Sequence, residues 1–98
     1  MGKYLILWEV DQAKIPINPK ERKEGWSMLM AMTGQDMEKG LTKDWGAFVG
    51  ENKGYAVSEG TELEVMSSMQ QYVPFCTFKV YPIATMQQVN EMIKALAG

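Results

Sequence analysis

Glu9 and Tyr55 are the two side chains in this sequence that are best suited to chemistry. Glu9 lies near the end of a mainly apolar segment, residues 4–10. Removal of a carboxylate from water favours its neutral form, and such a group can give or take a proton near neutral pH. Tyr55 could orient a substrate oxygen from a neighbouring strand. The alternative is that Glu9 ends its strand in solvent or bonded to a backbone amide, and the two hypotheses differ in where the strands place it.

Seven further side chains are predicted to line a ligand pocket around this pair. Alternation along extended segments puts six of them on the same side as Glu9 and Tyr55, namely Leu5, Leu7, Val57, Thr77, Lys79 and Tyr81, and the seventh is Trp45. Thr77 is expected to flank Glu9, with Lys79 and Tyr81 nearer Leu5. Trp45, at the start of a predicted edge strand, is expected to meet a ligand or a second subunit. The alternative is that these residues form a solid interface with no pocket.

The first half of the chain reads as strand, helix, strand. Residues 3–10 alternate as a strand with apolar side chains on both faces, which indicates a central position. Asn18 is a helix N-cap followed by Pro19, and Lys39-Gly40 ends the predicted helix. Residues 41–60 form a hairpin, with its turn predicted at residues 51–54.

The second half repeats the strand, helix, strand order and adds a terminal helix. Thr61 and Glu64 form a capping box that begins a helix, and Thr85 and Gln88 form another. Between them, residues 75–81 alternate as a strand. Apolar residues recur at helical spacing through the last segment. The chain is therefore predicted to be one α+β domain, residues 1–98.

Two such halves with right-handed crossovers give a ferredoxin-like βαββαβ fold. Its four-stranded antiparallel sheet has the order 4-1-3-2, with both crossover helices on one face. The other face is left uncovered. Leu5, Leu7, Val57, Phe75 and Tyr81 would form an apolar area there, which is typical of a partner surface or a pocket wall.

Composition removes several classes of function. The 98 residues carry a net charge of −2, and their ten Lys and Arg form no basic stripe, so no nucleic-acid partner is expected. With no histidine, the chain lacks the usual ligand to haem iron and the base of a catalytic triad. We predict no cofactor and no metal. No apolar run reaches the length of a membrane span, and one cysteine suits a reducing compartment, so a cytoplasmic protein is expected.

Several segments together resemble a known superfamily, the dimeric α/β-barrel proteins. They are Tyr-Leu-Ile-Leu-Trp-Glu (4–9), Lys-Asp-Trp-Gly-Ala-Phe (43–48), Lys-Gly-Tyr-Ala-Val-Ser-Glu-Gly (53–60), Tyr-Val-Pro-Phe (72–75) and Phe-Lys-Val-Tyr-Pro-Ile (78–83). The resemblance covers nearly the whole chain and is closest to an uncharacterised branch, a domain of unknown function. More distantly the chain is similar to muconolactone isomerases, antibiotic-biosynthesis monooxygenases and haem-degrading monooxygenases.

This resemblance implies a homodimer in which two sheets enclose a ligand cavity. The haem-degrading members hold iron through a histidine, which this chain lacks. Two hypotheses for function follow. The first is binding of a small hydrophobic or aromatic compound, with cofactor-independent isomerase or oxygenase-type chemistry in which Glu9 is acid or base and Tyr55 its helper. The second is a non-catalytic homodimeric interaction or sensor module.

Overall fold

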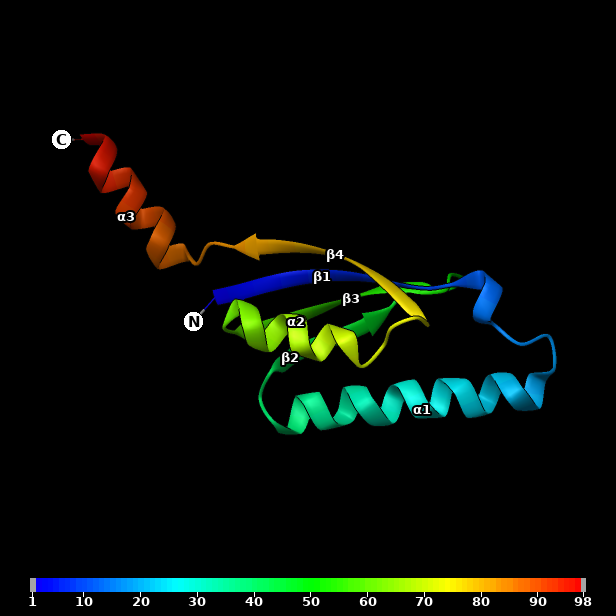
Figure 1. Ribbon diagram of the computed structural model, residues 1–98. Coiled ribbons are helices and arrows are strands. Elements are labelled where there is room, and N and C mark those ends of the chain that lie inside the picture. The colour runs from blue at the N-terminus through cyan, green and yellow to red at the C-terminus, as the bar shows by residue number, and fades with distance from the viewer. Residues whose placement is uncertain (1, 98) are drawn as a thin grey trace.

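The computed structural model describes residues 2–97 and shows one antiparallel sheet with two helices on one of its faces (Figure 1). The elements in chain order are β1 (Gly2–Val10), a 3-10 turn η1 (Gln12–Lys14), α1 (Pro19–Glu38), β2 (Thr42–Ala47), β3 (Lys53–Gly60), α2 (Glu62–Gln70), β4 (Cys76–Ile83) and α3 (Met86–Ala97). The strand order β2-β3-β1-β4 is the predicted 4-1-3-2 order, taken from the other edge. The α+β class and ferredoxin-like arrangement are therefore confirmed.

The helix signals of the sequence lie where the helices begin and end. The side chain of Asn18 accepts a hydrogen bond from the Lys20 backbone, and Pro19 is the first residue of α1. Gly40 follows the helix with a φ of 78°, a conformation that costs glycine little. Thr61 and Glu64 form both hydrogen bonds of a capping box at α2.

The hairpin turn lies earlier than predicted. Residues 48–52 connect β2 to β3, and Gly50 takes the positive φ of 84° that the reversal needs. Lys53 and Gly54, predicted to be turn residues, belong to β3, where they pair with Glu9 and Trp8 of β1. The last strand also differs from its predicted limits of 75–81, because β4 begins at Cys76 and continues to Ile83.

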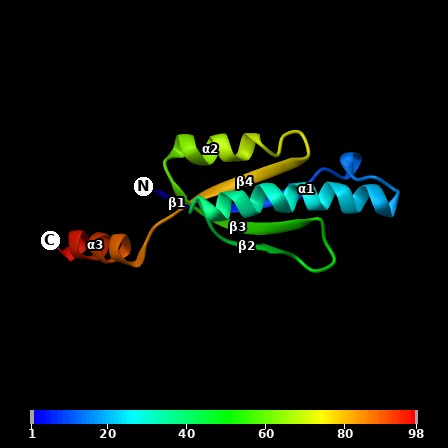
Figure 2. The same cartoon turned by 90° about the horizontal axis from the view of Figure 1, so that it is seen from below.

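The hydrophobic core lies between the sheet and the helices α1 and α2 (Figure 2). Ile6, Trp8 and Val10 alternate on the covered face of β1 and are at most 7% exposed. Ala56 lies beside Ile6 on β3, and Val65 of α2 packs against them. We call this side of the sheet the covered face and the other side the open face.

Helix α3 stands apart from the rest of the molecule. Thr85 and Gln88 make both bonds of the predicted capping box, and the helix then extends beyond the end of β4 (Figure 1). The radius of gyration is 16.3 Å, compared with about 13 Å for a compact chain of this length. Across residues 2–97 there is no helix with both the length and the apolar character that crossing a bilayer requires.

Candidate functional site

The open face carries eight of the nine predicted site residues. Leu5 of β1 lies between Val57 and Tyr81, and Leu7 lies between Tyr55 and Lys79. Glu9 pairs with Thr77 of β4, as predicted, and with Lys53 of β3. Backbone alternation therefore aligns these side chains in rows across three strands.

Glu9 is not isolated in an apolar site in this structure. Its Oε1 lies 3.8 Å from Nζ of Lys53, and about half of each side chain is exposed. A hollow of about 310 Å³ lies beside it on the open face. Its walls include Leu7, Glu9, Phe48, Lys53, Thr77 and Lys79. The carboxylate is therefore solvated and ion-paired at the rim of a hollow.

Tyr55 directs its hydroxyl to Asp44 of the neighbouring edge strand. Its hydroxyl donates a hydrogen bond to Oδ2 of Asp44, 2.9 Å away on β2, and its ring lies against Gly46, where any side chain would collide with it. This hydrogen bond, together with desolvation and the Asp44 charge, raises the pKa of the Tyr55 hydroxyl. Tyr55 lies opposite Leu7, diagonal to Glu9, and its hydroxyl is directed toward the edge strand, so a joint role of Glu9 and Tyr55 stays a prediction.

Trp45 is the predicted pocket residue that lies on the covered face. Its ring stacks on Trp8 with centroids 5.3 Å apart and planes at 7°, and Trp26 meets Trp8 edge-on at 6.3 Å. The pairing of β2 with β3 shifts between Thr42 and Asp44. One inserted residue reverses which face the following side chains occupy. This irregularity therefore turns Trp45 toward the helices.

Asp36 of α1 forms a buried polar cluster that the sequence analysis missed. It is 2% exposed. Its Oδ2 accepts hydrogen bonds from the Ser68 hydroxyl at 2.8 Å and the Tyr72 hydroxyl at 3.1 Å, and Gln71 Nε2 lies 3.3 Å from both carboxylate oxygens. Asp36 follows Thr33 by three residues and so continues the inward stripe of α1. A carboxylate on an apolar stripe was the signal that could have identified it.

Tyr72 is the most strongly perturbed titratable group in this cluster. Desolvation by burial raises the pKa of its hydroxyl to about 12, the Asp36 carboxylate adds to the increase, and a hydrogen bond with Thr33 opposes it. The Thr33 hydroxyl lies 3.4 Å away and donates to the Leu29 carbonyl. At neutral pH Tyr72 is therefore a protonated donor, held against Asp36.

An inner cavity of about 50 Å³ lies between this cluster and the three indoles. Its polar wall includes the hydroxyls of Ser58 and Thr42, which face each other across β3 and β2 and are 2% and 8% exposed. Among the hydrogen bonds of residues 2–97, neither hydroxyl has a partner. Within the same residues, every fully enclosed side-chain polar atom has a hydrogen-bond partner. Both hydroxyls therefore still reach the space of the cavity.

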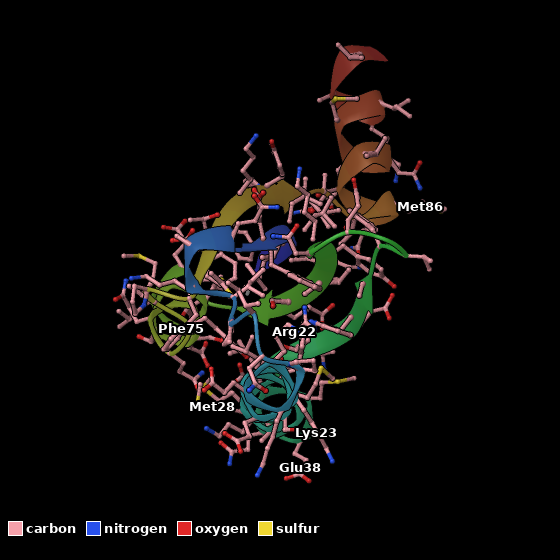
Figure 3. All side chains as sticks on the ribbon, turned by 90° about the vertical axis from the view of Figure 1, so that its right-hand side faces the viewer. Arg22, Lys23, Met28, Glu38, Phe75 and Met86 are labelled. Carbon is pink, nitrogen blue, oxygen red and sulfur yellow. The ribbon has the colours of Figure 1, made fainter. Side chains whose placement is uncertain are left out.

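An outer cavity of about 160 Å³ adjoins the inner one under the first half of α1. Trp26 and Leu29 line both cavities. The remaining walls of the outer cavity are mainly apolar, with two basic residues among them, and are Val10, Lys14, Ile15, Pro16, Arg22, Gly25, Met28 and Phe75. Figure 3 shows Arg22, Met28 and Phe75 around this side of α1.

Comparison with known proteins supports the sequence analysis at the level of the family. Residues 2–97 match the family described as "Domain of unknown function (DUF3303)". No curated protein matches the chain. The match extends from β1 to α3 and so includes both faces of the sheet. The chain belongs to the DUF3303 family.

Proposed function

We propose that this protein binds a small organic molecule in the space between α1 and the sheet. The observation that carries the proposal is the pair of buried hydroxyls, Ser58 and Thr42, that face the inner cavity without partners. Because both hydroxyls reach the space of the cavity, a polar group of a ligand or an ordered water can supply their hydrogen bonds there.

The two cavities together offer the size and polarity of a ligand site. An apolar cavity of about 150 Å³ is large enough to hold a benzene ring, and the outer cavity is about 160 Å³. The inner cavity is smaller and carries the polar groups. Trp26 lines both cavities, so a ligand in either one contacts its indole. A single ring with a polar substituent fits this arrangement.

The charges favour a substituent that donates hydrogen bonds. Asp36 accepts three neutral donors, while both ion pairs found within residues 2–97, Lys53–Glu9 and Lys43–Glu59, lie on the open face. Among these residues Asp36 therefore forms no ion pair with a lysine or arginine. Indole faces attract cations as well. A phenol or an aromatic amine suits the inner cavity better than a carboxylate does.

The geometry supports binding more directly than it supports catalysis. Isomerase or oxygenase-type chemistry at Glu9 with Tyr55 as helper would need the two groups at one ligand, and Tyr55 is bonded to Asp44. The family carries no reaction in its description. Catalysis at Glu9 therefore stays a prediction. Its test is loss of any observed turnover in Glu9→Gln.

Intrinsic fluorescence tests the binding proposal, because all three tryptophans of the chain belong to the stacked group beside the cavities. We expect p-cresol and benzylamine to change the emission and phenylacetate to have little effect. Ser58→Ala should weaken binding of p-cresol about fivefold, the effect of one neutral hydrogen bond. Isothermal calorimetry on the same variant checks the affinity.

Ser67→Ala is the control, since it makes the same substitution at an exposed serine of α2 that lines neither cavity. It should bind p-cresol as the unaltered protein does. Equal weakening by both substitutions, or no response to p-cresol and benzylamine at millimolar concentration, would contradict the proposal. Tight binding of phenylacetate that is lost in Arg22→Ala would place the ligand in the outer cavity alone.

We also propose that the open face is the interface of a homodimer, which corresponds to the dimeric α/β-barrel arrangement. The observation in favour is the apolar centre of that face, where Leu5, Leu7, Tyr55, Val57 and Tyr81 lie in adjacent register positions and Tyr81 is 49% exposed. Apolar areas of this kind are typical of protein interfaces. Sedimentation should give twice the chain mass of 11.1 kDa, and a stable monomer at micromolar concentration would exclude the dimer.

A further inference from the structure

Helix α3 presents an apolar stripe that no other element of residues 2–97 covers. Its exposed large apolar residues recur at helical spacing, with exposures between 41% and 82%, and are Met86, Val89, Met92, Ile93 and Leu96. Polar residues, among them Gln87, Glu91 and Lys94, occupy the rest of the helix. Such a stripe normally packs against another element.

Helix α3 lies on the open side of the sheet. In Figures 1 and 3, α1 and the sheet lie below α3, so that α3 rises on the side of the open face. It leaves the sheet next to the end of β1 that holds Lys3. Helix α3 therefore extends beyond the end of the sheet on its open side.

The opposite end of the open face offers a site for such a stripe. The hollow of about 310 Å³ lies there, with Leu7 and the 42% exposed Phe48 in its lining. β3 has eight residues, so the two ends of the sheet are about 26 Å apart. A helix of twelve residues that starts beyond one end and points away cannot reach the other end of its own sheet. A second copy can supply that contact.

The charges on the open face match a second copy of the same chain. Along β1 the side chains on this face are Lys3, Leu5, Leu7 and Glu9, and along β3 they are Lys53, Tyr55, Val57 and Glu59. A copy laid face to face, with its strands antiparallel to these, puts lysine over glutamate at both ends of β1 and β3. Its leucines then meet in the centre. This is the self-complementarity that a twofold interface needs.

The area of the sheet alone is too small for a stable dimer. Four strands about 4.8 Å apart and about 26 Å long present roughly 500 Å², compared with about 800 Å² per partner in a standard interface. The stripe of α3 is about 18 Å long and about 10 Å wide, so it adds roughly 180 Å². Its docking site on the other copy adds a similar area. Only the combination reaches the usual size.

We propose that α3 of each subunit docks its apolar stripe in the hollow between Phe48 and Lys79 on the open face of a second copy, in a twofold dimer with antiparallel strands. The inference rests on the homodimer put forward above and adds which segments meet. It gives Glu9, Thr77 and Lys79 a role at the border of the interface. The hollow on the open face is then occupied by the partner subunit's helix, and the small-molecule site remains under α1.

Disulfide trapping in the full chain tests this placement. Phe48→Cys and Ile93→Cys change exposed positions on the hollow and on the stripe, and a disulfide forms only where the two Cα atoms come within about 7 Å. The native Cys76 is buried, and desolvation raises the pKa of its thiol, so it competes weakly. An equimolar mixture of the two variants should form the 48–93 disulfide about tenfold faster than either variant alone, because docking raises the local thiol concentration.

Glu24→Cys on an exposed position of α1 is the control, and it should trap neither partner. Sedimentation of the unaltered chain separates the two levels of the proposal. A monomer would overturn the dimer itself. A dimer in which Ile93→Cys traps only itself would show that the strands run parallel and that the two α3 helices meet. A dimer without any trapping at residue 93 would show that α3 docks elsewhere.

Discussion

The two faces of strand β1 differ in how far the chain's own helices bury them. On β1, the side chains of Ile6 and Trp8 are 1% and 7% exposed within a single chain. Their neighbours Leu5 and Leu7 are only half-buried, and Glu9 is exposed. The covered face is therefore packed by the helices α1 and α2, whereas these helices leave the open face uncovered. From Leu5 to Glu9, burial along β1 therefore changes at each step in the alternation of the strand.

The polar groups on the two faces follow the same division. Asp36 on the covered side is enclosed and accepts hydrogen bonds from three side chains. Glu9 on the open side is half exposed and is 3.8 Å from one lysine. Removing the hydrogen-bond partners of a buried carboxylate lowers the free energy of unfolding strongly, while an exposed ion pair contributes little to it. Substitutions on the two faces should therefore differ in size and in their dependence on protein concentration.

The largest difference is expected between Ile6→Ala and Leu5→Ala. The first deletes a fully buried side chain and should lower the free energy of unfolding by about 3 kcal/mol. The second should cost about 1 kcal/mol or less in the monomer. If the open face is a dimer interface, only Leu5→Ala should shift the sedimentation equilibrium toward monomer. Urea unfolding at two protein concentrations measures both effects, and equal losses for the two variants would contradict the division.

Asp36→Ala and Glu9→Ala sharpen the comparison at the level of charge. Asp36→Ala leaves the hydroxyls of Ser68 and Tyr72 without their acceptor inside the protein, and we expect a loss of about 2 kcal/mol in the free energy of unfolding. Glu9→Ala should cost at most about 0.5 kcal/mol, because its ion pair is exposed. Thermal unfolding at low and high salt separates them, since salt screens only the exposed pair. A larger loss for Glu9→Ala than for Asp36→Ala would contradict the prediction that the buried carboxylate contributes more to stability.

Much of the fold could be predicted because its signals are local. Asn18 and Pro19 begin α1, two capping boxes begin α2 and α3, and alternation gave the strand faces of β1, β3 and β4. The hairpin turn was misplaced because Asn52, Lys53 and Gly54 have the residue types of a turn, and nothing local distinguishes Gly50, which has the positive φ, from Gly54, which lies under the Trp8 ring.

The candidate site was harder to predict, because it depends on contacts between distant segments. Trp45 lies on the covered face because of a shift in strand pairing that no residue type predicts. Tyr55 finds its partner Asp44 across the hairpin. The Asp36 cluster joins residues 32 to 36 positions apart in sequence. Only the inward position of Asp36, in register with Thr33 on α1, was visible in advance, and its partners required the three-dimensional fold.

The smallest of the three contrasts is expected between Tyr72 on the covered face and Tyr81 on the open face, and it depends on pH. Tyr72→Phe removes a hydroxyl that donates to Asp36, so we expect a loss of about 1 kcal/mol in the free energy of unfolding at pH 8. The folded state holds the pKa of Tyr72 at about 12, compared with 10.0 for an unperturbed tyrosine. Between these values the folded chain binds more proton than the unfolded chain.

The free energy of unfolding contributed by Tyr72 is therefore complete below pH 10 and decreases as the pH rises toward 12. Urea midpoints measured between pH 8 and pH 11 should fall less steeply for Tyr72→Phe than for the unaltered protein. Tyr81→Phe removes a hydroxyl from the open face and should keep the steeper decline. If Tyr72→Phe leaves that decline unchanged, the Tyr72 proton is not held by the cluster, and the contrast between the two faces would then rest on packing alone.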